Sequence, residues 1–272
     1  MSAVAAEGAR RQHFDPPGPL FAALETRAFA ERAQMTALLP ALRRLPRGDG
    51  HPVVVFPGFT ATDRSTEPLR RLLRDLGYRT YGWSGGRNVG PTVEALEVIV
   101  ERLEHAYSRD EREVSLIGWS LGGMYARELA RSLPNMVRQV ITLGSPIQMV
   151  EQDKSGAERM WQAMRRRHVA GFVRQEREAT RPLLEVPATS IYTRTDGVVP
   201  WQASLIRRTD RTENIRVYGS HCGLGFNVAA IYAIADRLAQ PDGQWRHFRA
   251  PFPLRLHYPP ATDLEPDRLP GH

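Results

Sequence analysis

Cysteine is nearly absent from this 272-residue sequence, which contains only Cys222. A single cysteine excludes an intramolecular disulfide and any metal site built from cysteines. Cys222 follows His221, so thiol chemistry is one interpretation, although we favour a small residue that fills a tight loop. The eight histidines show no zinc-ligand spacing either. We therefore expect a protein that needs neither a metal nor another cofactor.

Lysine is almost as rare, because Lys154 is the only one and arginine supplies the other 36 of the 37 basic side chains. The formal net charge of +7 would suit a nucleic-acid partner. However, the arginines are spread along the whole chain, and no basic block is interleaved with aromatic residues. We interpret the excess of arginine as a general compositional bias and expect no nucleic-acid partner.

Long hydrophobic runs are missing as well, since no apolar stretch approaches the roughly 18 residues of a membrane span. Residues 1–11 lack the charged start and the continuous apolar stretch of a secretory signal, so we expect a cytoplasmic protein. With 42% hydrophobic and 25% charged residues, the chain has the composition of a globular protein, and its length suits one sizeable domain.

The first predicted segments are a polar leader, residues 1–19, and a basic amphipathic helix, residues 20–47. The helix is predicted because apolar side chains recur at helical spacing. These apolar positions are Leu20, Leu24, Met35, Leu38, Leu39, Leu42 and Leu45. We favour packing of this helix against its own domain, and peripheral contact with a membrane surface is the alternative.

Residues 48–240 alternate predicted strands and helices, the pattern of an α/β domain whose parallel sheet is covered on both faces. Predicted strands cover residues 51–56, 78–83, 113–118, 137–143, 188–194 and 214–218. Predicted helices cover residues 65–76, 91–107, 124–133 and 226–239. Residues 147–186 interrupt the alternation as an insertion. Residues 241–272 are a proline-rich tail for which we expect no regular structure.

The most informative motif is Gly118-Trp119-Ser120-Leu121-Gly122. It follows an apolar, strand-like run and precedes a helix-like stretch, which is the context of a nucleophile elbow. The serine on such a sharp turn has strained backbone dihedrals, and neighbours that carry a Cβ would clash. Ser120 is therefore the predicted nucleophile, and a simple turn in a surface loop is the alternative.

A serine hydroxyl needs a base to take its proton, usually a histidine that a carboxylate holds in the correct tautomer. Asp196 and His221 each follow a predicted strand, and the order Ser120, Asp196, His221 is the one expected for this architecture. Glu151 and Asp153, which follow the strand predicted before the insertion, remain alternatives for the acid.

These motifs resemble those of the α/β-hydrolases, in particular the serine esterase and lipase branch. The resemblance covers roughly residues 51–240 and rests on Phe56-Pro57-Gly58-Phe59, on the serine motif and on Leu143-Gly144-Ser145-Pro146. It implies an α/β-hydrolase fold, with a mostly parallel central sheet, helices on both faces and a short helical cap. In the last segment, Ser145 lacks an elbow, and we expect a structural role for it.

The resemblance also implies that the backbone N–H groups of Phe59 and Leu121 form an oxyanion hole, which stabilises the charge that develops on a carbonyl oxygen. An ordinary hydrophobic turn residue is the alternative for Phe59. The chain departs from many lipases at Pro57 and Trp119, where they have histidine. Trp119 is for this reason a candidate pocket residue.

The insertion at residues 147–186 lies where this family usually carries its cap. Its apolar side chains are therefore candidates for the substrate pocket, although the same stripe would also suit simple packing against the body of the domain. The candidates are Met160, Trp161, Met164, Phe172 and Val173.

Together these features predict a serine hydrolase that cleaves carboxylic esters of apolar acyl groups through an acyl-enzyme. Its substrate would be a small-molecule or lipid ester. The same triad serves thioesterases, amidases and acyltransferases, so these activities remain alternatives. A non-catalytic binding protein that retained the fold is a further alternative, but the intact order of Ser120, Asp196 and His221 argues against it.

Overall fold

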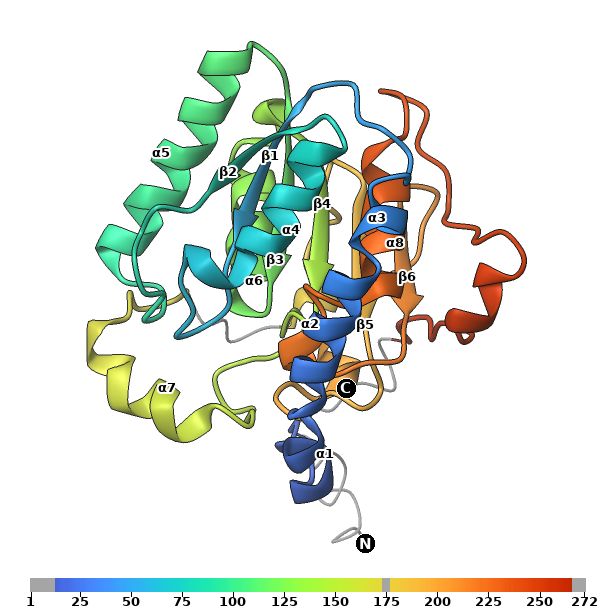
Figure 1. Cartoon of the computed structure of the whole chain (residues 1–272). Coiled ribbons are helices and arrows are strands. Elements are labelled where there is room, and N and C mark those ends of the chain that lie inside the picture. Colours follow the sequence, from blue (N-terminus) through green and yellow to red (C-terminus); the bar gives the residue numbers. More distant parts are fainter. Residues whose placement is uncertain (1–12, 173–176, 266–272) are drawn as a thin grey trace, which may run out of the picture.

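A parallel sheet of six strands forms the centre of the computed structural model, which describes residues 13–172 and 177–265 (Figure 1). The strands are β1 (Pro52–Phe56), β2 (Arg79–Gly82), β3 (Val114–Trp119), β4 (Val137–Leu143), β5 (Ala188–Tyr192) and β6 (Thr212–Arg216). Their order in the sheet is β2-β1-β3-β4-β5-β6. The chain therefore reverses direction across the sheet between β1 and β3, and such reversal points place ligand sites at the carboxyl ends of strands.

Alternation along the strands explains why helices cover both faces of the sheet. Val53 and Val55 pack with α4 (Asp63–Asp75) and α8 (Val228–Leu238) on one face. Val54 and Phe56, which point the opposite way, pack with α5 (Val93–Asp110) and α6 (Leu121–Ser132). All five residues of β1 are buried. This arrangement confirms the predicted α/β class and the α/β-hydrolase fold.

The single helix predicted over residues 20–47 is instead three short helices, α1 (Pro19–Leu24), α2 (Arg27–Ala37) and α3 (Leu39–Leu42). Pro40 explains one division, because proline has no N–H to continue the hydrogen bonds of α2. Met35 and Leu42 join the core on the α4 and α8 face. Leu20 and Phe29, by contrast, are 69% and 80% exposed.

The insertion between β4 and β5 contains α7 (Glu158–Met164), followed by a 3₁₀ turn at Arg165–Arg167. After this turn, residues 168–172 form no helix, so Phe172 lies in a loop. The remaining 3₁₀ turns are Pro134–Met136, Glu178–Thr180, Trp201–Ser204, His221–Gly223 and Leu254–His257. The last of these is the only helical turn in the described part of the tail, residues 241–265.

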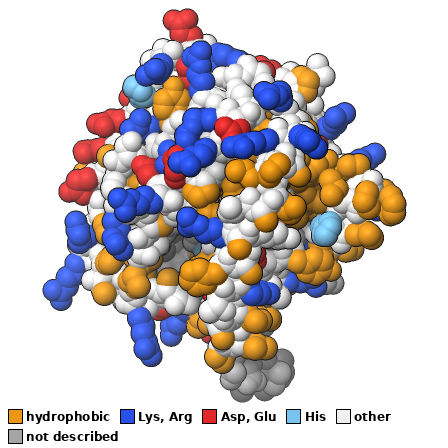
Figure 2. All heavy atoms as spheres, viewed as in Figure 1, with side chains coloured by type: hydrophobic (Ala, Val, Ile, Leu, Met, Phe, Trp, Pro, Cys, Tyr) orange, Lys and Arg blue, Asp and Glu red, His pale blue; other side chains and the backbone are white. Residues whose placement is uncertain are grey.

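The surface in Figure 2 carries arginine side chains scattered among acidic and apolar ones, without one continuous basic block. Among the described residues, no helix combines the length and the apolar character needed to cross a lipid bilayer.

The buried ring of His51, just before β1, bonds an exposed carboxylate on one side and a buried hydroxyl on the other. The ring of His51 bonds through Nδ1 to the Asp49 carboxylate at 2.5 Å and through Nε2 to the Ser115 hydroxyl at 2.8 Å. Burial lowers the pKa of His51 to about 4, and the positive charges of Arg138 and Arg112 act in the same direction, against the opposing effect of Asp49. The histidine is thus neutral in the folded protein at neutral pH.

Neutral, buried His51 predicts a loss of stability in acid. Its pKa of about 4 in the folded protein lies below the ordinary value of 6.5, so the unfolded chain binds the proton first as the pH falls. The contribution of neutral His51 to the free energy of unfolding is complete above pH 6.5 and is lost between pH 6.5 and 4. It amounts to about 3 kcal/mol. Urea unfolding across this range should show a steeper loss for the wild type than for His51→Gln. Parallel curves would contradict the prediction.

Candidate active site

The backbone at Ser120 makes the sharp turn that its motif predicts. Ser120 connects β3 directly to α6 with φ of 53° and ψ of −122°, a conformation that side-chain-bearing residues rarely adopt. Its N–H donates to the carbonyl of Leu143 at the end of β4, at 2.8 Å. The strained turn is thus held by the neighbouring strand.

The flanking glycines are required by close backbone contacts. A Cβ on Gly118 would lie 2.3 Å from the carbonyl oxygen of Gly122, and one on Gly122 would lie 2.4 Å from the carbonyl oxygen of Phe56. Because these are backbone atoms, they have little freedom to move aside. The two motif glycines therefore allow β3 and α6 to approach closely enough to form the elbow.

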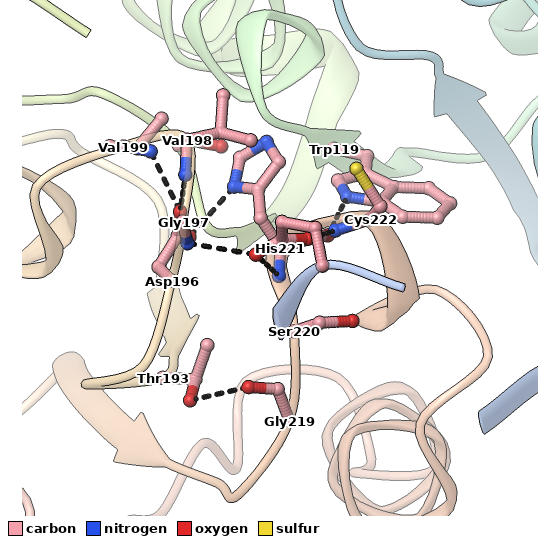
Figure 3. A network of polar contacts seen from close by, with 12 residues as sticks. Trp119, Thr193, Asp196, Gly197, Val198, Val199, Gly219, Ser220, His221 and Cys222 are labelled. Carbon is pink, nitrogen blue, oxygen red and sulfur yellow. Dashed lines mark hydrogen bonds and ion pairs between the residues drawn. The ribbon is translucent and has the colours of Figure 1, made fainter. Parts of the chain in front are cut away.

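Asp196 and His221, which the sequence places 25 residues apart, form a buried hydrogen-bonded pair (Figure 3). His221 Nδ1 lies 2.7 Å from Asp196 Oδ2, and the two residues are 5% and 3% exposed. The other carboxylate oxygen, Oδ1, accepts hydrogen bonds from the N–H groups of Val198 and Val199 at 2.9 and 2.7 Å. The carboxylate is therefore fixed by its own loop while it bonds the imidazole.

Two contacts bring this pair to the elbow. The indole N–H of Trp119, the residue before Ser120, donates to the carbonyl of His221 at 3.0 Å. Gly144 directly follows the Leu143 carbonyl that holds Ser120, and a Cβ there would lie 3.0 Å from His221 Nδ1 and 3.1 Å from Asp196 Oδ2. These contacts place Asp196 and His221 next to the carboxyl ends of β3 and β4, where Ser120 leads into α6.

The surroundings of His221 make it a stronger base. Burial lowers its pKa, but the charge of Asp196, its hydrogen bond and the charge of Glu25 raise it, and the net change is upward from 6.5. The imidazole is therefore well suited to accept a proton and to hold it as an imidazolium beside the carboxylate.

The two alternative acids have other partners. Glu151 forms an exposed ion pair with Arg165. Asp153 is buried, accepts a hydrogen bond from the N–H of Phe14 at 2.8 Å and pairs with Arg177 at 2.7 Å. Asp196 is the acid whose carboxylate bonds the predicted base.

Asn88 holds the predicted oxyanion loop in place. Its amide donates to the carbonyl of Pro57 at 2.9 Å, its backbone carbonyl accepts from Thr60 at 2.6 Å, and its backbone N–H donates to Ala61 at 2.8 Å. These three bonds fix the loop on both sides of Phe59. The loop also lies against the nucleophile, since a Cβ on Gly58 in that loop would be 3.8 Å from Ser120 Oγ.

Within residues 13–172 and 177–265, the backbone N–H groups of Phe59 and Leu121 have no hydrogen-bond acceptor. Leu121 is the first residue of α6, where no acceptor exists within the helix. Among the described residues, both N–H groups therefore remain available to another acceptor, as the predicted oxyanion donors would have to be.

A cavity of about 490 Å³ opens beside Ser120. Trp161 and Phe172 from the insertion line it together with Phe59 and Leu121. The ring of Trp161 packs edge-on against Phe59, with ring centroids 5.3 Å apart. The insertion therefore contributes side chains to the lining of the cavity.

Three of the other predicted pocket residues, Met160, Met164 and Trp119, do not belong to the lining. Met160 is 49% exposed on α7, and Met164 lies outside the cavity as well. The ring of Trp119 packs against the ring of Phe226, with centroids 5.5 Å apart. Its indole N–H donates to the carbonyl of His221. Val173 lies outside the described residues.

Of the neighbouring Ser145 and Cys222, the first is buried, whereas the second is exposed and does not fill its loop. Ser145 is fully buried, and its hydroxyl donates to the carbonyl of Gly118 at 3.4 Å. Desolvation of the sulfur and the adjacent Glu25 carboxylate raise the pKa of the Cys222 thiol to about 12, so little reactive thiolate forms at neutral pH.

Four residues that hold the loops of this site carry no recognisable sequence signal. Asn88 fixes the oxyanion loop, and Glu25, Arg27 and Glu31 from the N-terminal helices bond the loops of Asp196 and His221. Their partners on these loops lie up to 197 positions away in the chain, so no local pattern could identify them.

Among the described residues, no cluster of three or more His, Cys, Asp or Glu side chains could hold a metal ion.

Comparisons with known proteins agree with this fold. A family model described as a PGAP1-like alpha/beta domain matches residues 78–215, about half of the chain. No curated protein matches the sequence. Lipase B of Aspergillus fumigatus has a similar structure, with a TM-score of 0.55 and 14% identity over 73% of this chain. The match spans only about half of that lipase, 55% of its chain.

Two further solved structures give the same result. One comes from the metagenome-derived lipolytic enzymes LipS and LipT, with a TM-score of 0.50 and 16% identity over 71% of this chain and 93% of that chain. The other is the pyrethroid hydrolase PytH, with a TM-score of 0.50 and 16% identity over 71% of this chain and 99% of that chain. At these identities the likeness shows a shared fold.

The close contacts at the elbow predict that Gly118→Ala is severely destabilising. The added methyl group would have to displace backbone atoms now 2.3 Å from its position, and we expect a loss of about 3 kcal/mol or more. Gly18→Ala is the matched control, because nothing lies within 4 Å of a Cβ there. Thermal unfolding of both variants tests the prediction, and equal melting temperatures would contradict it.

Proposed function

Because the chain belongs to the PGAP1-like α/β domain family, we propose that it is a serine hydrolase that cleaves carboxylic esters of apolar acyl groups. The observation that carries the proposal is the buried His221–Asp196 pair, held at 2.7 Å, beside the strained turn of Ser120. A serine hydroxyl becomes an effective nucleophile only next to a base that can take its proton. The raised pKa of His221 supports that role.

In the first half of the proposed reaction, Ser120 Oγ attacks the ester carbonyl and its proton passes to His221 Nε2. Asp196, bonded to Nδ1, stabilises the imidazolium that forms. The carbonyl oxygen takes up the electron pair of the broken π bond and is stabilised by the N–H groups of Phe59 and Leu121. The tetrahedral intermediate then collapses, His221 protonates the leaving alcohol, and the acyl group stays on Ser120.

In the second half, water replaces the alcohol. His221 takes a proton from water, the resulting hydroxide attacks the acyl carbon, and the same oxyanion donors stabilise the second intermediate. The bond between the acyl carbon and Ser120 Oγ breaks, and the serine recovers its proton from His221. A free carboxylic acid leaves, and water is the co-reactant that balances the two steps.

The cavity supports an apolar acyl group as the substrate part bound next to Ser120. Its lining includes Phe59, Leu121 and Met124 from the body of the domain and Trp161 and Phe172 from the insertion. Its volume of about 490 Å³ lies within the range of small-molecule sites. Of the charged lining residues, Glu151 and Arg165 are exposed and pair with each other, and the buried Asp153 pairs with Arg177.

Ser120→Ala should abolish ester hydrolysis. We expect kcat to fall by on the order of 10⁶, since a triad without its nucleophile retains only weak catalysis. The measurement is hydrolysis of p-nitrophenyl esters from acetate to palmitate, with the matching thioesters as a second series. Ser145→Ala, which removes a buried structural hydroxyl, is the control and should stay within tenfold of the wild type. Equal activity of the wild type and Ser120→Ala would refute the proposed nucleophile.

Asp196→Asn should leave the fold intact and lower kcat by on the order of 10³–10⁴, because an amide favours the wrong histidine tautomer and carries no charge. The wild-type kcat/KM should decline on the acid side with a pKa above 6.5, the ordinary value for histidine, because only neutral His221 accepts the proton. Glu151→Gln should cost less than tenfold. A larger loss of kcat for Glu151→Gln than for Asp196→Asn would show that Glu151, and not Asp196, is the acid.

A further inference from the structure

The first two helices form a strap, Pro19–Ala37, that lies against the loops carrying Asp196 and His221 (Figure 1). At the corner between α1 and α2, the carboxylate of Glu25 reaches both loops. Its Oε1 accepts the N–H of Gly197 at 2.8 Å and the N–H of His221 at 2.9 Å, and its Oε2 accepts the N–H of Cys222 at 2.7 Å. One side chain thus joins the backbone beside the acid to the backbone of the base.

The contact between the strap and the acid loop is too close for any residue except glycine. A Cβ on Gly197 would lie 2.3 Å from the carbonyl oxygen of Phe21. The position of Gly197 is therefore set by the strap, and Asp196 directly precedes it. Figure 3 shows Gly197 next to His221 and Cys222, where the three N–H groups gather.

Two other strap residues brace the same loops. The Arg27 guanidinium donates to the carbonyls of Thr195 and Gly219 at 3.2 and 3.1 Å, just before Asp196 and His221 respectively. Glu31 accepts from the N–H and the hydroxyl of Ser220 at 2.8 and 3.1 Å. Of the three strap side chains, Glu25 alone bonds the backbone of the histidine itself.

We propose that Glu25 is a positioning residue of the active site, whose carboxylate fixes the spacing of Asp196 and His221 through the backbone of their loops. The proposal rests on the proposed function, since it assigns these two residues as acid and base. Glu25 is absent from the cavity lining. Glu25 acts through the loops, so its replacement lowers kcat and leaves substrate affinity unaltered.

Glu25 also acts through its charge. The Asp196 carboxylate and then the Glu25 carboxylate raise the pKa of His221 against the lowering effect of burial. Other ionisable groups lie on the loops and elements packed there, namely Arg27, Glu31 and Cys222. Glu25 is the one among the strap residues whose charge raises the pKa of His221. Its removal should therefore lower that pKa and move the acid limb of kcat/KM to lower pH.

Two variants separate geometry from charge. Glu25→Asp keeps the charge but is shorter by one methylene, about 1.5 Å, so it cannot reach all three N–H groups. We expect kcat to fall about tenfold or more with the acid limb close to that of the wild type. Glu25→Gln keeps the length and the Oε1 bonds but loses the charge and the bond to Cys222. It should lower kcat less, by about threefold to tenfold, and move the acid limb down by about half a pH unit.

Rates are measured per active site, titrated with a fluorophosphonate, so that unfolded protein does not count as a loss of kcat. Glu31→Gln is the matched control in the same strap, and we expect a lower melting temperature with the acid limb unshifted. NMR titration of His221 in the wild type and in Glu25→Gln measures the pKa change without turnover.

If both Glu25 variants keep kcat within twofold and the acid limb in place, Glu25 is a structural residue and the inference is overturned. A rise in KM with unchanged kcat would overturn it too. If Ser120→Ala remains as active as the wild type, the proposed function fails instead, whatever Glu25 does, and the NMR titration still reports whether Glu25 tunes His221.

Discussion

The close approach of β3 and α6 at Ser120 is the constraint on which the rest of the site depends. With glycine at positions 118 and 122, backbone atoms come within distances that no Cβ would tolerate. The serine is thereby held at a φ of 53°, between the end of a buried strand and the first turn of a helix. The turn lies against the loop of Phe59, and the N–H of Leu121, the first residue of α6, has no acceptor among the described residues. The strain is sustained because the surrounding sheet is buried on both faces.

The remaining groups reach the elbow because parallel strands end at the same edge of a sheet. Asp196 follows β5 and His221 follows β6, so two loops that are distant in sequence become neighbours. Apart from the 3₁₀ turn at His221–Gly223, neither loop is regular structure, and polar contacts hold the two loops: the Asp196–His221 bond, the indole of Trp119 and the carboxylate of Glu25. A single carboxylate that accepts three backbone N–H groups couples the loops more tightly than separate contacts would.

The α7 insertion and the N-terminal strap contact different parts of the candidate site. The insertion supplies aromatic side chains to the cavity wall, whereas the strap bonds the backbone from the other side and does not line the cavity. On our proposal, the side chains of the insertion determine which substrate groups fit next to Ser120. On the same proposal, the strap sets how well acid and base are aligned. The two properties can therefore change independently, since no lining residue of the cavity belongs to the strap.

The sequence by itself determined the fold class, the positions of the strands and the elbow, because alternating apolar runs and a glycine-flanked serine are local patterns. It also favoured Asp196 over Glu151 and Asp153, through the order of strand ends. Only the tertiary structure decided that Trp119 holds the His221 carbonyl, that Met160 and Met164 lie outside the cavity, and that the N-terminal helix is divided. The bonds of Glu25 and Asn88 join residues up to 197 positions apart. Such contacts arise from packing of the whole chain, so they leave no periodicity or spacing in the sequence.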